Sequence, residues 1–477
     1  MDRLCYRSAV DLRRLIGEKA ISPVELLEDC LARIEEINPT LNAITATCVE
    51  RALSEARAAE KAVLAGESLG LLHGLPIGIK DLQETAGVRT TFGSPLYADY
   101  VPEEDERVVT AMRRAGGIVV GKTNVPEFGA GGGCNNVVYG PTRNPFDSKR
   151  TCGGSSGGSA VALATGMLPL CTGSDTGGSV RIPAAFCGVV GFRPSPGLIA
   201  SERRPLGWAA ISVQGPMGRS VEDAHLLLRA QISSDSRDPL SAPFDCAAFT
   251  TIAPVDLSRL RVAVSEDLGG APIEQSIRST FRERIGTISS DFRSCDRRDP
   301  DMRGAESAFA VIRAQNYLAV HRENIEKHRE QLGPFIIANY EQGLAMSAAD
   351  VAHAHAQQTR IYRAFHRFFE EVDILICPTV GVPPFPLEQM YPTYVGGQEM
   401  ENYFSWFGLT YYLSLTGHPC ISIPCGLEPS GTPFALQICG PARKDKFVLE
   451  VAHAIERRLQ RDPRTAGPIP NLAGLAR

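Results

Sequence analysis

Two glycine-rich segments of the sequence carry serines that could act as nucleophiles. Residues 152–159 are CGGSSGGS, and residues 173–184 are GSDTGGSVRIPA. A serine hydroxyl becomes nucleophilic when a base removes its proton, and glycines let a substrate carbonyl come close to backbone N–H groups. Such glycines can also cradle a phosphate or form the sharp turn of a nucleophile elbow. Three kinds of chemistry are therefore open.

Phosphate binding fits these segments poorly. A P-loop ends its glycines in GK[ST], and a dinucleotide-binding turn needs GxGxxG between a strand and a helix. Neither segment has these features. No His, Cys or acidic residues are clustered with the spacing of a zinc site either. We therefore predict that the protein uses neither a cofactor nor a metal.

A nucleophile elbow is a closer match. The stretch from Gly154 to Gly158 fits GxSxG, with Ser156 at the nucleophile position. An elbow follows an apolar strand directly, whereas residues 144–152, NPFDSKRTC, are largely polar. An esterase of the α/β-hydrolase type is therefore the weaker alternative.

One lysine occupies an unusual position. The chain has eight lysines against 41 arginines, and Lys80 ends the segment GLPIGIKD, which otherwise has the pattern of a buried strand. Burial lowers the pKa of a lysine, so Lys80 could be a neutral base near pH 7. The alternative is a lysine whose charge reaches solvent or pairs with Asp81 or Glu84, which is the more common case for a lysine considered alone.

Taken together, Lys80 and the two glycine-rich segments resemble the amidase signature family, serine hydrolases with a Ser-cisSer-Lys triad. The resemblance extends from SPVELLEDCLARIEEINPTLNA near the start to LTGHPCISIP and PFALQICGP near the end, and it is most specific at about residues 120–200. It implies that Ser179 is the nucleophile, that Ser155 is the bridging serine with a cis peptide bond, and that Lys80 is the base.

The same resemblance implies how the substrate is held. The backbone N–H groups expected to bind the oxyanion belong to Thr176, Gly177, Gly178 and Ser179. The segment GAGGGC is expected to line the acyl pocket through Gly129, Ala130, Gly131 and Cys134.

Several neighbouring residues are expected to have structural roles. Asp175 and Arg181 flank the nucleophile, and we expect them to form an ion pair that braces its loop. Cys134 is expected to be a passive thiol. His418, in TGHP, is expected to be structural because the mechanism of the family uses no histidine.

The function implied is an amidase that hydrolyses a carboxylic amide to a carboxylate and an amine or ammonia through a seryl acyl-enzyme. A cluster of aromatic residues could line an apolar or aryl acyl pocket or simply pack a helix on the sheet, and both interpretations stay open. The cluster comprises Tyr403, Phe404, Trp406, Phe407, Tyr411 and Tyr412.

Two other functions stay open on this scaffold. One is the glutamine-hydrolysing A subunit of a tRNA-dependent amidotransferase. The resemblance implies that this branch carries an arginine for the glutamine carboxylate in the region of residues 330–347. No arginine lies between Arg329 and Arg360, which makes this alternative weaker. The other is a non-catalytic binding protein, against which the intact Lys80, Ser155 and Ser179 argue.

Periodic patterns indicate the elements that position these residues. Ser22, Pro23 and Glu25 form a capping box before an amphipathic helix, and a second helix is expected in CVERALSEARAAEKAVLAG. Short apolar runs ended by glycine then alternate with helical stretches, which predicts an α/β sheet covered by helices on both faces. The family resemblance implies the amidase signature fold, a large mixed sheet between layers of helices. Stretches of polar residues at about 231–256 and 289–305 are expected to be loops or an inserted surface region.

We expect one domain over residues 1–477. Its parts are an N-terminal helical layer (1–65), the signature core (66–230), a variable segment (231–335) and a C-terminal part of the same sheet and pocket (336–477).

Composition narrows the class of partner. The formal net charge of −5 and the isoelectric point near 6.1 show no excess of positive charge that would attract nucleic acid or an anionic membrane. Thirteen cysteines without CxxC pairs indicate reduced thiols, and no apolar run has the length of a signal peptide or membrane span. We predict a cytoplasmic protein, a small-molecule amide as its partner, and a possible homodimer.

Overall fold

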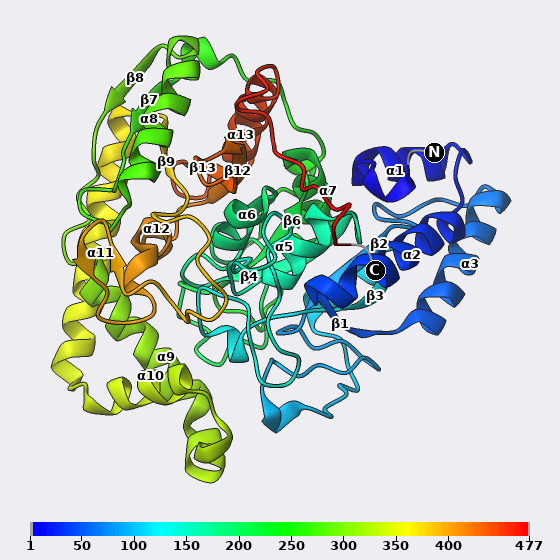
Figure 1. Ribbon diagram of the computed structural model, residues 1–477, viewed down its shortest axis with the longest axis horizontal. Coiled ribbons are helices and arrows are strands. Elements are labelled where there is room, and N and C mark those ends of the chain that lie inside the picture. Colours follow the sequence, from blue (N-terminus) through cyan, green and yellow to red (C-terminus); the bar gives the residue numbers. More distant parts are fainter. Residues whose placement is uncertain (1–2, 242, 476–477) are drawn as a thin grey trace.

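The computed structural model describes residues 3–241 and 243–475 (Figure 1). Within these residues one mixed sheet of 11 strands runs in the order β1-β3-β2-β4-β6-β5-β12-β13-β9-β7-β8. Its strands are β1 (Ile44–Thr47), β2 (Pro76–Lys80), β3 (Ile118–Thr123), β4 (Leu170–Asp175), β5 (Val190–Arg193), β6 (Val213–Gly218), β7 (Arg261–Val264), β8 (Ser294–Arg297), β9 (Ile374–Pro378), β12 (Cys420–Leu427) and β13 (Pro433–Cys439). A separate small hairpin comprises β10 (Tyr394–Val395) and β11 (Gln398–Glu399).

The α-helices are distributed along the whole chain. They are α1 (Ala9–Gly17), α2 (Pro23–Leu41), α3 (Val49–Ala65), α4 (Arg107–Arg114), α5 (Gly157–Ala164), α6 (Arg181–Cys187), α7 (Val221–Gln231), α8 (Gln275–Ile288), α9 (Ala305–His328), α10 (Pro334–Ala345), α11 (Ala348–Glu371), α12 (Gly408–Thr416) and α13 (Asp445–Leu459). Across the described residues, none of these helices combines the length and apolar character needed to cross a bilayer.

The sheet is mixed, as the family resemblance implies. Strands β3, β2 and β4 are parallel neighbours at one end, and β9, β7 and β8 are parallel neighbours at the other. The strands between them pair antiparallel. Helix α6 packs against β5, β12 and β13, while α7 packs against β6 and α13 against β12. The predicted α/β fold is confirmed.

The two N-terminal helices form as expected. Ser22 caps α2: its Oγ accepts a hydrogen bond from Val24 N at 2.9 Å, and its own N–H donates to Glu25 Oε2 at 2.9 Å. The short strand β1 between α2 and α3 was not predicted, and it pairs antiparallel with β3 at the sheet edge. The N-terminal segment therefore contributes a strand as well as helices.

One expected loop is wrong. The segment 289–305 contains β8, which pairs in parallel with β7 at the outer edge of the sheet. Its sequence, SCDR, lacks apolar alternation because the strand is half exposed, so no signal distinguishes it from a loop. The other segment, 231–256, is largely irregular among its described residues and holds a short 3₁₀ helix at Cys246–Phe249.

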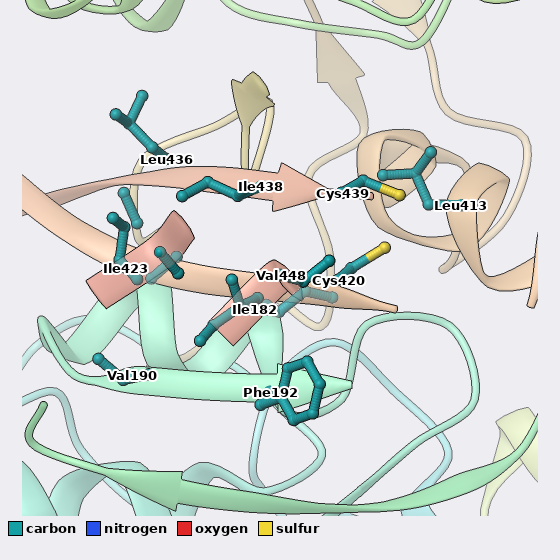
Figure 2. Close-up of a cluster of buried hydrophobic side chains, with 14 of the residues drawn as sticks. Ile182, Val190, Phe192, Leu413, Cys420, Ile423, Leu436, Ile438, Cys439 and Val448 are labelled. Atoms are coloured by element: carbon teal, nitrogen blue, oxygen red, sulfur yellow. The ribbon is translucent and has the colours of Figure 1, made fainter. Parts of the chain in front are cut away.

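The apolar core beneath α6 holds the end of one serine-containing loop in place. Figure 2 shows Ile182 of α6 among side chains from β5, β12 and β13. Those labelled include Phe192, Ile423, Leu436 and Ile438, all fully buried. Burying each such side chain contributes roughly 1.5–3 kcal/mol. Because α6 begins two residues after Ser179, this packing fixes the C-terminal end of that loop.

Candidate active site

Lys80 and the loop of Ser179 meet because they follow neighbouring strands. β2 and β4 are parallel, with Ile77 opposite Leu170 and Gly78 opposite Cys171. Parallel strands end at the same sheet edge, which is where open α/β sheets place ligand sites. Lys80 is the last residue of β2, and the loop 176–179 follows β4 directly.

Lys80 points toward serine hydroxyls and has no carboxylate partner within the described residues. Its Nζ lies 2.8 Å from Ser155 Oγ and 2.9 Å from Ser174 Oγ. The side chain is fully buried, and this burial lowers the pKa of the amine to about 7. The alternative of an ion pair is not realised among the described residues, because Asp81 Oδ2 accepts a hydrogen bond from Thr91 Oγ1 at 2.5 Å and Glu84 pairs with Arg203.

Ser155 and Ser179 face one cavity. The Gly154–Ser155 peptide bond is cis, as the family resemblance implies. Both serines line a cavity of about 230 Å³, and Ser156 N donates to Ser179 O at 3.1 Å, which ties the two loops together. A Cβ on Gly154 would lie 2.3 Å from Gly133 O, so only glycine permits this close backbone approach.

Ser156 does not have the position of an elbow nucleophile. It is fully buried, does not line the cavity that holds Ser155 and Ser179, and its Oγ accepts a long 3.5 Å hydrogen bond from Ser174 N. The residues before it form a loop rather than a strand. The geometry therefore disfavours the α/β-hydrolase alternative.

Residues of the loop after β4 line the cavity. Thr176, Gly177 and Ser179 line it, and their N–H groups make no hydrogen bond within residues 3–241 and 243–475. Gly178 differs from the expectation, because its N–H donates to Asp175 Oδ1 at 2.9 Å and is not available to a substrate. Gly178 has φ +132°, and a Cβ there would lie 2.3 Å from Thr410 Oγ1, so glycine is required.

A buried charge cluster braces this loop. The Asp175 carboxylate accepts hydrogen bonds from Arg181 Nε at 3.0 Å and from Arg181 Nη2 at 2.9 Å, so the expected ion pair is present. Arg193 adds a further contact at 3.0 Å. Although burial alone raises the pKa of Asp175, the two guanidinium groups hold it well below its usual range. Asp175 therefore stays charged and fixes the loop.

The predicted pocket residues are divided between two cavities. Gly129 and Gly131 line the cavity of Ser179, whereas Ala130 and Cys134 line a larger cavity of about 670 Å³. Gly131 lines both, so the two cavities adjoin there. The site thus has a small chamber with the serines and a larger chamber beside it.

Comparison with known proteins agrees with this geometry. Residues 25–449 match the Amidase family. The chain belongs to this family. An acylamidase of Rhodococcus erythropolis is 33% identical over 459 residues, which covers 95% of either chain. The A subunit of glutamyl-tRNA(Gln) amidotransferase from Thermosynechococcus vestitus is 31% identical over 474 residues, 94% of this chain and 97% of the relative.

A solved structure extends the likeness to the fold. The crystal structure of a bacterial aryl acylamidase of the amidase signature family superposes with a TM-score of 0.88 at 27% identity, covering 95% of this chain and 96% of that one. The predicted family and fold are confirmed. The protein is a hydrolase that acts on amides.

Members of the aromatic cluster lie both in the cavity wall and in the core. In this amidase Tyr403 and Phe407 line the cavity of Ser179. Trp406 instead stacks on Phe186 at 6.2 Å and belongs to the core. His418 is fully buried against Phe365, with ring centroids 4.7 Å apart, and lines neither of the two cavities.

Sequence reasoning missed two residues beside Lys80. Ser174 contacts its amine, and Thr172 Oγ1 accepts a hydrogen bond from its backbone N–H at 2.8 Å. The sequence could have revealed both residues. Thr172 and Ser174 are alternate residues of β4, so their side chains lie on the same face, and both contact Lys80 of the neighbouring β2. A third residue, Arg313 of α9, also lines the cavity but carries no signal in the sequence.

Proposed function

We propose that this amidase forms its acyl-enzyme at Ser179, with Ser155 as a proton relay and Lys80 as the base. The observation that carries the proposal is the 2.8 Å contact between the buried Lys80 Nζ and the Oγ of Ser155, which lines the same cavity as Ser179. An amine with a pKa of about 7 is substantially neutral at neutral pH and can accept a proton.

The first half of the reaction would form the acyl-enzyme. Ser179 Oγ attacks the amide carbon while its proton passes to Ser155 Oγ, and the Ser155 proton passes to Lys80 Nζ. The oxyanion would be held by the N–H groups of Thr176, Gly177 and Ser179, each worth a few kcal/mol. Lys80 then returns its proton through Ser155 to the leaving nitrogen, the C–N bond breaks, and the amine or ammonia departs.

The second half would regenerate the serine. Water attacks the ester carbon of the acyl-enzyme and gives its proton through Ser155 to Lys80. The proton returns to Ser179 Oγ as the ester bond breaks, and the carboxylic acid product leaves. Ser179, Ser155, Lys80 and one water molecule balance all of these steps.

The substrate class is a linear carboxylic amide. The larger cavity could accept an aryl or apolar group of the substrate, because Phe335 and Phe385 line it together with Ala130. The similarity to a bacterial aryl acylamidase supports the same expectation.

Turnover by the purified chain alone tests this function. We expect it to hydrolyse aryl and aliphatic amides, releasing one amine per carboxylate, and hydroxylamine to trap the acyl group as a hydroxamate. Ser179→Ala should abolish both, while Ser156→Ala should retain both. A chain inactive without a partner protein would favour the amidotransferase alternative, and turnover unchanged in Ser179→Ala would contradict the proposal.

A further inference from the structure

Helix α9 forms one wall of the cavity that Ser179 lines, and this wall contains an arginine. Phe309, Arg313, Tyr317 and Val320 lie along one face of the helix at spacings of three to four residues, and all line the cavity. Across the described residues the lining includes two arginines and neither Asp nor Glu. The chamber is therefore positive and has no acidic side chain of its own.

Arg313 is buried without a counterion. Its side chain is 5% exposed, and one guanidinium nitrogen donates to Asn339 Oδ1. The other terminal nitrogen, Nη2, is buried and has no hydrogen-bond partner among the described residues. Aromatic rings surround the group, with Tyr403 4.4 Å and Phe404 4.6 Å from its central carbon. Burial lowers the pKa of Arg313 to about 10, so it is still a cation at neutral pH.

The other buried arginines of the described chain show how unusual this is. Arg181 and Arg193 share Asp175, Arg33 lies 3.1 Å from Glu36, and Arg284 lies 2.7 Å from Glu283. Buried charges are costly unless they are paired. The second arginine of the cavity, Arg204, also has a carboxylate, Asp238, at 3.5 Å.

Arg313 lies close to the loop of Ser179. Phe309 packs on that loop, since a Cβ on Gly177 would lie 3.0 Å from its ring. Arg313 lies one turn further along α9, which is about 6 Å along the helix axis. Arg313 and Ser179 line the same cavity of about 230 Å³, whose volume admits only a small substrate between them.

We infer that Arg313 binds a carboxylate of the substrate, so that this amidase acts on small amides that carry a carboxylate group. The inference rests on the proposed function for the position of the reacting carbon. A carboxylate would accept a charge-assisted hydrogen bond from the unpartnered Nη2, and such bonds are stronger at a buried group than in water. Arg313 would then determine specificity and take no part in bond breaking.

Matched substrate pairs test this inference in the unmodified protein. Glutaramate is compared with pentanamide for a carboxylate on the acyl side, and N-propanoylglycine with N-ethylpropanamide for one on the amine side. We expect kcat/KM to favour the carboxylate in one pair by at least about 10–100-fold, mainly through KM. Equal or better turnover of the neutral amide in both pairs would overturn the inference.

Variants then assign the preference to its residue. Arg313→Met should remove most of the preference and leave turnover of the neutral amide, while Arg313→Lys should restore part of it. Arg322→Gln is the matched control, because Arg322 lies on the exposed face of α9 and pairs with Glu326, and its preference should equal that of the wild type. A preference unchanged in Arg313→Met would overturn the inference.

One further measurement separates this inference from the proposed function. Labelling of Ser179 by a fluorophosphonate should persist in Arg313→Met, which shows that the variant is folded with an intact nucleophile. If Ser179→Ala still turns over both members of a pair, the proposed function fails whatever the preference. If the label persists and the preference is absent, only the role of Arg313 fails.

Discussion

Two buried lysines on neighbouring strands have the same burial and opposite surroundings. Lys80 on β2 and Lys122 on β3 are both fully buried, and the residue opposite Lys122 in the parallel register is Ile79, next to Lys80. Burial lowers the pKa of Lys80 to about 7 and that of Lys122 to about 8. Lys80 contacts serine hydroxyls beside a cavity, whereas Lys122 donates to Gln83 O and to Thr85 Oγ1.

A lowered pKa alone therefore does not identify a base. Successive side chains of a strand point to opposite faces of the sheet. Lys122 therefore lies on the face opposite to that of Lys80, and there the carboxyls of Asp81 and Glu106 raise its pKa against the effect of burial. Neither lysine lines the cavity of Ser179 itself, but Ser155, which contacts Lys80, does. What distinguishes Lys80 is a hydroxyl chain that ends at a space where a substrate can bind.

Replacing Lys80 should have the most severe consequence. Lys80→Met and Lys80→Arg should each lower kcat/KM by at least about 10²–10⁴-fold, since neither side chain can accept a proton at neutral pH. Steady-state kinetics measure the loss. Near-normal turnover by Lys80→Arg would show that Lys80 is only a structural cation.

Replacing Lys122 should lower stability and largely preserve turnover. Lys122→Met leaves Gln83 O and Thr85 Oγ1 without their buried donor, which should cost about 1–3 kcal/mol of unfolding free energy. Turnover per folded molecule should stay within about tenfold of the wild type, because the serine relay is intact. Urea denaturation and kinetics on the same preparation measure both. A collapse of turnover without loss of stability would erase the distinction between the lysines.

The neighbouring serines provide a second contrast of the same kind. Ser155→Ala interrupts the path from Ser179 to Lys80 and should lower kcat by about 10²–10⁴-fold. Ser156→Ala removes a buried hydroxyl that does not line the cavity and should change kcat only slightly. Comparable losses in the two variants would contradict the assignment of the relay.

The pH dependence should follow Lys80 and not Lys122. Because burial lowers the pKa of Lys80 to about 7, its neutral form is present above that pH and is protonated below it. We expect kcat/KM to rise tenfold per pH unit below about 7 and to level off above it. Lys122→Met should keep this profile. A profile that is flat through pH 7, or one that shifts in Lys122→Met, would oppose the assignment of Lys80 as the base.

The mildest change is expected at Cys134, a second nucleophilic side chain near the site. It lines the larger cavity rather than that of Ser179, and it is 2% exposed. Cys134→Ala should therefore leave kcat nearly unchanged and alter at most KM for bulky amides. Loss of hydroxamate trapping in this variant would indicate a thiol intermediate instead.

Much of this site could be predicted because its residues lie close to strand ends that apolar patterns reveal. Lys80 ends a run of buried residues, and the pairing of Asp175 with Arg181 joins positions six residues apart. The roles of Ser155 and Ser179 came from the family resemblance, since the residues alone left the elbow hypothesis for Ser156 open. The engagement of the Gly178 N–H by Asp175 depends on side-chain geometry that no pattern encodes.

The remaining features depend on contacts between distant segments. Arg313 reaches the cavity from α9, a long helix of mixed polar and apolar residues in which one arginine does not stand out from the others. Thr410, 233 residues from Gly177, accounts for the glycine at 178. The edge strand β8 is polar and half exposed, so periodicity could not reveal it.

Covalent labelling locates the nucleophile without reference to any substrate. The purified chain is treated with a fluorophosphonate, digested, and the modified peptide is fragmented by mass spectrometry to locate the adduct. We expect one adduct, on Ser179, which is absent in Ser179→Ala, strongly slowed in Lys80→Met and retained in Lys122→Met. An adduct on Ser156 with Ser179 unmodified would contradict the proposed relay and establish the nucleophile elbow in its place.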